Sequence, residues 1–527
     1  MKKYPVGIQT FERIVKEGFV YIDKTDLVWK LTKVSPFVFL SRPRRFGKSL
    51  LSSTLHSYFE GKKELFEGLK IMQLELEWEH YPVIHIDLSA TKHLPIQQVR
   101  EELFLQLSLL ERTYGSSELE TSPGMKLSGI IRRAYEQTGK QVAIIIDEYD
   151  APLLDNLQDE TQLQETREVL QEFYQRLKML DPYIKFCFIT GITKFSQLSI
   201  FSTLNNLTNV TLQPEFSAIC GITEQELATD MKQDIAMLAE EYGCTPEEMH
   251  AKLKQRYDGY HFSEKSPDIY NPFSLLKAFM QKKIDNYWFE SGTPTFLIQQ
   301  MYHYKTDITN TDDILAFASD FDRPTEAMTS ALPLLYQCGY LTIKDYDRET
   351  ETYRLSLPNQ EVRIGYSEGL MPVYLGIDSS NVKTGFAMKF WQALKKEDIN
   401  LALHEMQSYF ASLPYIEGFK KKMGDITKAE GFYEWTFNLI FSMLNIYVCT
   451  QVKTIKGRTD MVVWMPNTIY VFELKINDSA ANALQQIEDK GYAIPYQTDG
   501  RKVIKVGIHF STETLNIEDW EIGGRAH

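Results

Sequence analysis

The stretch from Ser41 to Leu50, SRPRRFGKSL, constrains the fold of this chain more than any other. It follows the short apolar run Phe37–Leu40, and apolar residues at helical spacing continue after it from Leu51 to Phe59. A strand, a tight loop and a helix in this order are the context of a phosphate-binding loop. Backbone N–H groups at the start of such a helix point at the anion, and the helix dipole attracts it. We therefore expect a P-loop NTPase core.

Within this loop we assign the nucleotide contacts to seven consecutive residues: Arg44, Arg45, Phe46, Gly47, Lys48, Ser49 and Leu50. Lys48 would reach the outer phosphates of ATP, and the Ser49 hydroxyl would bind Mg²⁺. The match is incomplete, because Arg42 stands where the motif G-x-x-x-x-G-K-[ST] has its first glycine. A basic turn that caps a helix is the alternative interpretation of the same residues.

A second apolar run, Val142–Ile146, ends in the acidic stretch Asp147-Glu148-Tyr149-Asp150. A continuous apolar run is typical of a strand buried on both faces, and open α/β sheets bind ligands at the carboxyl ends of their strands. We expect Asp147 to hold Mg²⁺ through water and Glu148 to polarise the water that attacks the γ-phosphate. A surface turn after a core strand is the alternative, but the P-loop upstream favours the nucleotide site.

The rest of the N-terminal third alternates between strand and helix patterns. Residues 83–87 and 185–190 have strand character, whereas residues 96–114 and 166–180 have apolar residues at helical spacing. This alternation predicts a parallel sheet with helices on both faces.

Three residues that end or follow the strand 185–190 are candidates for sensing the γ-phosphate. Thr190 and Thr193 would supply hydroxyls, and Lys194 a positive charge. Ordinary turn formation is the simpler interpretation of each. Residues 6–11 and 21–25, ahead of the first strand, would either close over the adenine base or pack on the sheet as an N-terminal hook.

The order of elements predicts an α/β multidomain protein. At 527 residues, two to four domains are expected. We divide the chain into a P-loop ATPase core of the AAA type (residues 1–215), a helical lid (216–290), a winged-helix-like module (291–372) and a restriction-endonuclease-like α/β domain (373–527). The lid would otherwise be a spacer that never touches the ligand. The acidic residues 345–347 in the wing favour domain packing over DNA binding.

Composition excludes several classes of protein. The net charge of −14 argues against a protein that coats nucleic acid non-specifically, although it leaves room for a local basic channel. The five cysteines are scattered without metal-ligand spacing, which suits a reducing cytoplasm and predicts no zinc site. No apolar run is long enough to cross a membrane, and the first residues lack the apolar core of a signal peptide. We therefore expect a cytoplasmic protein with no membrane partner.

A second constellation of charged residues lies near the C-terminus. Asp460 precedes an apolar strand, and Glu473 and Lys475 stand two residues apart in the next strand. Alternate residues of a strand share a face, so Glu473 and Lys475 point the same way, and a hairpin turn at Pro466-Asn467 would bring Asp460 near them. Two carboxylates and a backbone carbonyl form a hard-oxygen site for Mg²⁺. The set suits metal-assisted phosphodiester hydrolysis, with Lys475 positioning or helping to deprotonate the water.

Two simpler interpretations of this region remain open. A glutamate and a lysine at a strand end are common on protein surfaces. The helical pattern that begins at Ala483 carries Gln486, which would orient the nucleophile, but taken alone an ordinary helix with a solvated polar face is the simpler interpretation.

Together these motifs resemble the bacterial AAA-ATPase-like proteins that carry a C-terminal PD-(D/E)XK nuclease domain. The resemblance covers nearly the whole chain and rests on Arg42-Pro-Arg-Arg-Phe-Gly-Lys-Ser49, Tyr21-Ile-Asp-Lys-Thr25, Asp147-Glu-Tyr-Asp150, Thr190-Gly-Ile-Thr-Lys194, Tyr257-Asp-Gly-Tyr260, Ser291-Gly-Thr293, Gly457-Arg-Thr-Asp460, Glu473-Leu-Lys475 and Gln486-Ile487. It implies an ATPase core of the additional-strand type, with the nucleotide roles given above. It also implies that Asp460, Glu473 and Lys475 form the nuclease core, and that the helix glutamate of that fold falls on Glu430 or Glu434.

We accordingly expect an ATP-binding and ATP-hydrolysing protein coupled to a nuclease that acts on DNA with Mg²⁺ or Mn²⁺. The alternative is a nucleotide-dependent switch whose C-terminal domain binds nucleic acid or protein without cutting, which the acidic net charge favours. A structural ATP-binding protein without hydrolysis is a third reading, and Glu148 beside Asp147 speaks against it. Formation of a homo-oligomer is left open.

Overall fold

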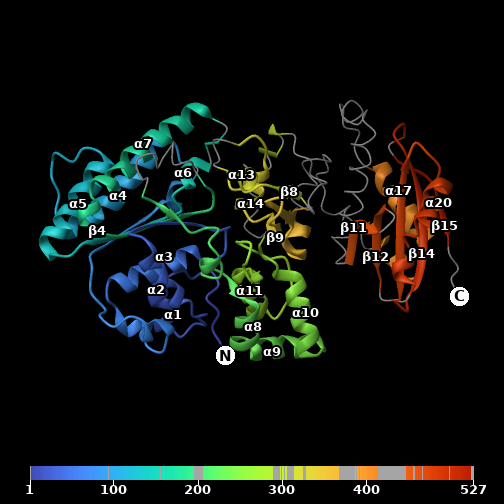
Figure 1. Cartoon of the computed structure of the whole chain (residues 1–527), viewed down its shortest axis with the longest axis horizontal. Helices are drawn as coiled ribbons and strands as arrows, with labels where there is room; N and C mark the ends of the chain where they lie inside the picture. Colours follow the sequence, from blue (N-terminus) through green and yellow to red (C-terminus); the bar gives the residue numbers. More distant parts are fainter. Residues whose placement is uncertain are drawn as a thin grey trace. The chain divides into compact units, whose positions relative to one another are not determined.

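The structure is a computed structural model of the chain and forms two compact units (Figure 1). The first comprises Met1–Thr306 and Thr311–Val362, and the second comprises Asp307–Asn310 and Arg363–His527. The residues described are 2–92, 94–154, 156–157, 159–194, 206–288, 297, 300–301, 303–304, 314–323, 328–366, 386, 389–390, 392–412, 447–454, 457–465, 467–497, 499–514 and 516–523, with the backbone alone for 412, 447–454 and 457–459. No helix in these ranges is long and apolar enough to span a bilayer.

The first unit is built on a five-stranded sheet. Its strands are β1 (Phe37–Ser41), β2 (Val83–Asp87), β3 (Val142–Asp147), β4 (Ile184–Gly191) and β5 (Thr208–Asn209). They pair in the order β2-β3-β4-β1-β5, and every pairing is parallel. The parallel sheet is therefore confirmed, and β4 is the additional strand between β1 and β3. Every residue of β1 and β3 is buried, as their uninterrupted apolar runs predict.

Helices cover both faces of this sheet (Figure 1). One group comprises α1 (Phe11–Lys16), α2 (Thr25–Val34) and α3 (Lys48–Phe59); the other comprises α4 (Ile96–Tyr114), α5 (Pro123–Thr138), α6 (Ala151–Leu154) and α7 (Glu160–Met179). Short 3₁₀ turns lie at Lys63–Phe66, Lys70–Gln73, Leu88–Thr91, Asp181–Tyr183 and Pro214–Phe216. Helix α7 begins earlier than the expected residue 166, because the Asp159 side chain caps it by accepting from the N–H groups of Thr161 and Gln162.

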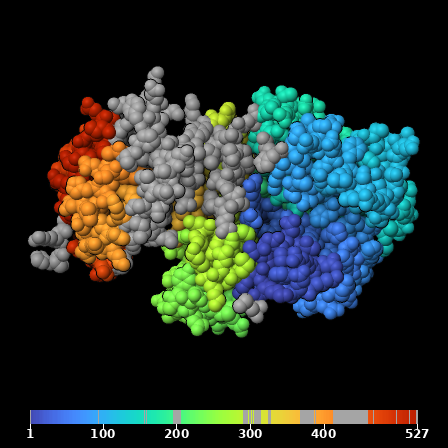
Figure 2. All heavy atoms as spheres, turned by 180° about the vertical axis from the view of Figure 1, so that it is seen from behind, coloured from blue at the N-terminus to red at the C-terminus, as the bar shows by residue number. Residues whose placement is uncertain are grey.

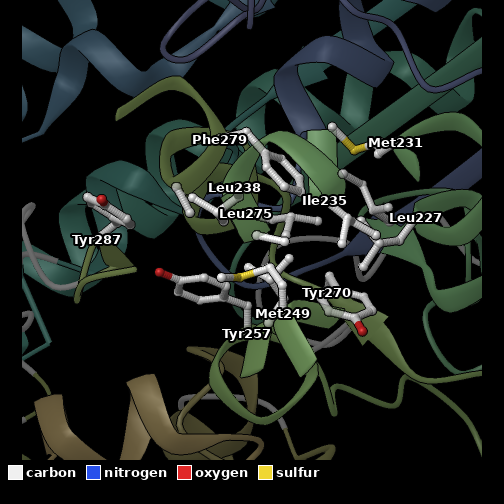
Figure 3. Packing of buried hydrophobic residues seen from close by; sticks show 14 residues of the cluster. Leu227, Met231, Ile235, Leu238, Met249, Tyr257, Tyr270, Leu275, Phe279 and Tyr287 are labelled. Carbon is white, nitrogen blue, oxygen red and sulfur yellow. The ribbon is translucent and has the colours of Figure 1, made fainter. Parts of the chain in front are cut away.

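A compact helical block follows the sheet, over the range expected to form a lid. Its elements are β6 (Ile222–Thr223), α8 (Glu224–Asp230), α9 (Lys232–Tyr242), α10 (Pro246–Tyr257), β7 (Ile269–Tyr270) and α11 (Pro272–Gln281). Figure 3 shows its apolar core, in which Leu238, Met249 and Leu275 are buried. The N-terminal segment packs on this block, since the Tyr4 ring stacks on Phe279 and the Lys2 amine pairs with Asp234 at 2.6 Å. Figure 2 shows the N-terminal surface in dark blue adjoining the green block.

A small sheet module closes the first unit. It contains β8 (Ile314–Ala316), α13 (Ala318–Phe321), α14 (Leu332–Gln337), β9 (Thr342–Asp347) and β10 (Thr352–Ser356), with the antiparallel strand order β8-β10-β9. The helix, strand, wing and strand were expected, whereas β8 was not. Strand β9 starts after Tyr340 and Leu341 because the N–H groups of both residues bond back to the Leu335 carbonyl.

The described part of the second unit is a five-stranded mixed sheet with helices on both faces. It contains α17 (Ile399–Ser412), β11 (Tyr447–Thr454), β12 (Gly457–Trp464), β13 (Thr468–Ile476), α20 (Ala480–Lys490), β14 (Lys502–Ser511) and β15 (Asn516–Gly523). The strand order is β11-β12-β13-β14-β15, and the β13–β14 pair alone is parallel. The hairpin expected between residues 460 and 475 is thus confirmed, with β12 reaching back beyond Asp460. Helix 430–445, expected from the sequence, lies outside the described residues.

Two contacts place the helices on opposite faces of that sheet. A Cβ on Gly507 of β14 would lie 2.3 Å from the Ala480 carbonyl oxygen, so a glycine there lets α20 approach the sheet closely. Phe510, three residues on and facing the other way, packs edge-to-face against Phe410 of α17. The face that carries Glu473 is therefore the one that α20 covers.

Candidate functional site

The loop between β1 and α3 has the geometry of an anion-binding turn. Gly47 caps α3 with φ 94° and ψ 22°, a left-handed conformation that glycine adopts without steric cost. Nothing lies within 4 Å of a Cβ built on Gly47, so the requirement for glycine is conformational. The loop also places Arg45 at φ 70°. The amino end of α3 consequently lies at the carboxyl end of the sheet, where a phosphate would be attracted.

Arg42, in the place of the first motif glycine, is an internal anchor. Its side chain is 1% exposed. The guanidinium donates to the carbonyls of Ser41, Thr211 and Phe216, each at 2.9 Å, and lies 4.3 Å from the Phe262 ring centroid. Burial lowers the pKa of Arg42 to about 10. The arginine side chain therefore points into the core and leaves the loop's concave side to its backbone.

Lys48, Glu148 and Lys92 form a charged cluster at the end of β3. Lys48 Nζ donates to the carbonyls of Arg42 at 3.0 Å and Pro43 at 3.2 Å, and lies 3.7 Å from Glu148 Oε1. Lys92 Nζ lies 3.4 Å from the other carboxylate oxygen of Glu148. Burial alone would raise the pKa of Glu148, but the charges of Lys48 and Lys92 hold it below its ordinary value. Glu148 is thus an ionised carboxylate held by two ammonium groups.

Glu148 also has a strained backbone, with φ 50°. A non-glycine residue in the left-handed region costs energy and persists only where its surroundings impose it. The strain turns the Glu148 side chain toward Lys48, while its N–H donates to Asp147 Oδ1 at 2.9 Å. The two successive acidic residues therefore face the same space at the end of the sheet.

Asp147 lies against Ser49, as the motif predicts. Asp147 is almost fully buried, and the neighbouring Ser49 hydroxyl favours its ionised form. Burial raises the pKa of Asp147 to about 6, and the nearby charge of Glu148 adds to the effect. A buried carboxylate beside a hydroxyl is a pair of hard oxygen donors, and a divalent cation would stabilise its ionised form.

The hydroxyls of Thr193 and Thr190 donate hydrogen bonds to groups within the protein. Thr193 Oγ1 and the Thr193 N–H each donate to Asp150 Oδ2 at 2.6 Å, and Thr190 Oγ1 donates to the Leu40 carbonyl at 2.7 Å. Asp150 is fully buried, and burial raises its pKa. A Cβ on Gly191 would lie 2.3 Å from Asp150 Oδ1, so the glycine makes room for this carboxylate. Asp150 thereby ties the end of β4 to the end of β3.

Lys194 connects this segment to the small sheet module. Its Nζ pairs with Asp322 Oδ2 at 2.6 Å, and its N–H donates to Gln337 Oε1 at 2.9 Å. The lysine proposed from the sequence as a charge near the γ-phosphate is thus engaged with the module that contains α13 and α14.

The remaining residues predicted to contact the nucleotide belong to the loop itself and to the first turn of α3. The positive charge of Arg44 helps to lower the pKa of Glu148. The Arg45 guanidinium lies 4.3 Å from the Phe273 ring centroid. Phe46 is buried edge-to-face against Tyr260. Leu50 lines an apolar cavity of about 90 Å³ beside Gly47, with further walls from Tyr21, Ile22, Ile219, Cys220, Gly221, Pro272 and Leu276. The P-loop therefore touches both the N-terminal segment and the helical block.

The second site lies on the face of the C-terminal sheet that α20 covers. The register that pairs Met461 with Phe472 sets Asp460 opposite Glu473. Leu474 N–H donates to Asp460 Oδ2 at 2.8 Å, and Asp460 N–H donates to Glu473 Oε2 at 3.4 Å. Glu473 is 2% exposed, whereas Lys475 is half-buried on the same face. The two carboxylates predicted from the sequence are brought together, and Lys475 lies on the same face of the sheet.

Gln486 joins this group. Its Nε2 donates to Glu473 Oε1, which fixes the carboxylate from the α20 side. Glu430 and Glu434, as well as the Ser291-Gly-Thr293 motif, lie outside the described residues. Over the part of the chain that is described, no cluster of three or more His, Cys, Asp or Glu side chains is arranged to hold a metal. Each proposed metal position accordingly relies on two side-chain oxygens, the usual situation where substrate phosphates and water complete the shell of Mg²⁺.

Sequence reasoning missed Lys92. It follows the 3₁₀ turn after β2, in a stretch without any motif. The parallel register that sets Asp87 beside Asp147 is what brings the end of β2, and Lys92 with it, to Glu148. The available signal was a basic residue that shortly follows β2, the strand that comes before β3 and its acidic end in the sequence.

Comparison with known proteins finds a family model for each of the two regions that contain these sites. The model of a family described as predicted AAA-ATPase matches residues 5–201, and the model of the PD-(D/E)XK nuclease superfamily matches residues 428–520. A protein of Azotobacter chroococcum mcd 1, described as "Uncharacterized protein in vnfD 5'region", is 33% identical over 530 residues, with 98% of each chain covered. Among solved structures, the Walker-type ATPase PABY2304 of Pyrococcus abyssi is 12% identical, with 69% of this chain and 97% of that chain covered, at a TM-score of 0.35.

Proposed function

Because this chain belongs to the family of predicted AAA-ATPases that carry a PD-(D/E)XK nuclease-superfamily domain, we propose that it hydrolyses ATP and couples this to Mg²⁺-dependent cleavage of DNA. The observation that carries the proposal is the pair of separate acidic sites, each with its own lysine. Glu148 faces Lys48 at the end of β3, and Asp460 and Glu473 share a sheet face with Lys475.

The ATPase half follows from the loop and the end of β3. Lys48 would exchange its contacts with the Arg42 and Pro43 carbonyls for the outer phosphates of ATP. Ser49 and Asp147 fit Mg²⁺, because they offer two adjacent oxygen donors and because burial disfavours an uncompensated Asp147 carboxylate. When bound, Mg²⁺ supplies charge neutralisation on the phosphates. Glu148, ionised and within reach of the same space, orients and polarises the attacking water.

The apolar cavity beside Gly47 suits a purine ring. Tyr21 and Ile22 supply one wall and Ile222 and Leu276 another, so the base would lie between the N-terminal segment and the helical block. This arrangement supports the role of the N-terminal segment as a cover over the base. It also supports a lid role for the helical block, because closing the block would bury the nucleotide.

The nuclease half rests on Asp460, Glu473 and Lys475. The two carboxylates offer hard oxygens in one place and fit Mg²⁺, or Mn²⁺ in its stead. When bound, the ion supplies activation of water and screening of the phosphate charge. Gln486 holds the Glu473 carboxylate in position, and Lys475 positions the water for attack. A phosphodiester in DNA, with its accessible backbone phosphate, is the substrate class this arrangement supports best.

A second candidate is a nucleotide-dependent switch whose C-terminal domain binds without cutting. The observation that favours it is that Glu473 Oε1 and Asp460 Oδ2 already accept hydrogen bonds from Gln486 and the Leu474 N–H. Such a protein would bind ATP and nucleic acid but would not cleave nucleic acid, whichever metal ion is supplied.

Cleavage of linear and plasmid DNA with Mg²⁺ or Mn²⁺, with and without ATP, decides between the two. We expect cleavage by the wild type and by the surface variant Glu513→Ala, and loss of cleavage in Glu473→Ala. Binding of DNA without cleavage in all three proteins would support the switch and overturn the nuclease.

A further inference from the structure

Beyond the two carboxylates and the lysine, the catalytic face of the C-terminal sheet carries a histidine. The parallel register of β13 and β14 sets Lys475 directly beside His509, and Glu473 beside Gly507. Because paired residues of neighbouring strands project from the same face, His509 shares the face of Glu473 and Lys475. Figure 1 shows β14 between β15 and the rest of this sheet. Gly507 has no side chain. From Glu473 toward the carboxyl ends of β13 and β14, the next side chains on this face are therefore Lys475 and His509.

Asp519 orients this histidine from the next strand. The register of β14 and β15 pairs His509 with Asp519, and His509 Nδ1 lies 3.4 Å from Asp519 Oδ1. With Nδ1 facing the carboxylate, Nε2 is the ring nitrogen that points elsewhere. The His509 side chain is 21% exposed, which leaves it open to a ligand at the surface. Within the described residues, His509 has no other hydrogen-bond or ion-pair partner.

Three charged groups face His509. Lys475 comes from β13, Asp519 from β15, and Asp478 from the turn before α20. The pKa of Asp478 lies below its ordinary value, first because the Ser479 N–H and the Asn482 side chain donate to it, and then because of the charges of Lys475 and His509. Lys475 and His509 thus share the sheet face of the carboxylate pair, and a phosphodiester bound on this face would lie near both side chains.

We propose that His509, positioned by Asp519, is a further catalytic residue of the phosphodiesterase and protonates the leaving oxygen. This inference rests on the proposed nuclease function. The oxygen of the attacking water forms a bond to phosphorus while the bond from phosphorus to the leaving oxygen breaks. The leaving oxygen takes the Nε2 proton of the His509 imidazolium and departs as an alcohol. The attacking water releases a proton to solvent, and His509 regains one from solvent.

The dependence on the leaving group tests this role. An ordinary sugar hydroxyl needs a proton to depart, whereas p-nitrophenolate does not. For His509→Gln, we expect DNA cleavage to fall roughly 10²-fold or more, because a general acid contributes that much. Hydrolysis of bis(p-nitrophenyl) phosphate by the same variant should stay within about threefold of wild type, because no acid is required. Asp519→Asn should show the same selective loss to a smaller extent.

His404→Gln is the matched control. His404 lies on α17 and packs against Trp520, which faces the opposite side of β15 from Asp519. The His404→Gln variant should cleave both substrates at the wild-type rate. An equal loss on both substrates in His509→Gln, or no loss on either, would overturn the general-acid role while leaving the nuclease intact. A wild-type protein that hydrolyses neither substrate with Mg²⁺ or Mn²⁺ would overturn the nuclease proposal itself, and the role of His509 with it.

Discussion

Lys48 Nζ lies 3.7 Å from Glu148 Oε1 across the end of the parallel sheet. The residue proposed to hold the outer phosphates therefore faces the residue proposed to polarise the attacking water. Lys92 holds the other oxygen of the same carboxylate at 3.4 Å. Binding of ATP would draw Lys48 toward the phosphates, and Lys92 would remain as the lysine that restrains Glu148.

The two partners should fail in different ways when each is changed. Lys48→Ala should weaken ATP binding at least about tenfold, because it removes a charge-assisted contact to phosphate. Glu148→Gln should bind ATP normally and lower turnover by roughly 10²-fold to 10⁴-fold, because it removes a general base. Equilibrium binding of a fluorescent ATP analogue and steady-state phosphate release separate the two effects. Lys16→Ala, on the exposed face of α1, is the control, and equal loss of binding in Lys48→Ala and Glu148→Gln would contradict the assignment.

Replacement of Arg42 by the glycine of the motif should lower the stability of the fold. Arg42→Gly removes a buried guanidinium that satisfies three carbonyls, and each buried acceptor left unpaired costs about 1–3 kcal/mol. Arg42→Lys should not rescue it, because an ammonium cannot reproduce the planar fork. Thermal unfolding measures the loss. Arg45→Gly, in the same loop but at φ 70°, should keep its stability or gain some, and a stable Arg42→Gly protein would refute the anchor role.

Asp147 should make stability depend on pH. Because burial raises its pKa from 3.8 to about 6, the ionised carboxylate is less favourable in the fold than in the unfolded chain. The stability it contributes is fully present below about pH 4 and is lost as the pH rises through about 6. Asp147→Asn should therefore stabilise the nucleotide-free protein at pH 8 by on the order of 2–3 kcal/mol, and the gain should shrink as the pH falls toward 4.

Denaturant unfolding at several pH values, with Mg²⁺ and ATP absent, checks this expectation. The exposed Asp230→Asn on α8 should show no such pH-dependent gain. A gain that is the same at every pH would show that the Asp147 charge is not its origin.

Gln486 should act through Glu473. Gln486→Leu leaves Glu473 Oε1 without its donor, and changes of this kind outside the ligand shell cost roughly 10-fold to 100-fold in metal affinity or activity. We expect slower DNA cleavage together with a higher Mg²⁺ requirement, both read from a metal titration. The neighbouring Gln485→Leu removes an exposed contact with Asp489 and should leave both values unchanged. Identical behaviour of the two variants would exclude the positioning role.

Much of the fold is encoded in local patterns. The apolar runs that end at Leu40 and Ile146 predicted fully buried strands, since a strand covered on both faces has no polar alternation to show. The turn at Pro466-Asn467 predicted the hairpin that pairs β12 with β13 and so brings Asp460 to Glu473. Sites made from residues near each other in a hairpin or loop are accessible to this reasoning.

Other site residues depend on long-range pairing that no local pattern encodes. The buried partners of Arg42 are Thr211, Phe216 and Phe262. The sequence around residue 42 therefore shows that the motif glycine is missing, but it does not show which residues bind the arginine side chain. Lys92 reaches Glu148, and His509 reaches Lys475, only through parallel strand registers. Parallel strands are joined by long crossovers, and their register cannot be counted off from a turn.

ATP turnover and DNA cleavage, measured side by side for the wild type, Lys48→Ala and Lys475→Ala, test the central claim most directly. We predict that Lys475→Ala abolishes cleavage and keeps ATP turnover, whereas Lys48→Ala abolishes both because the two activities are coupled. Undiminished DNA cleavage in Lys475→Ala, or undiminished ATP turnover in Lys48→Ala, would contradict this account.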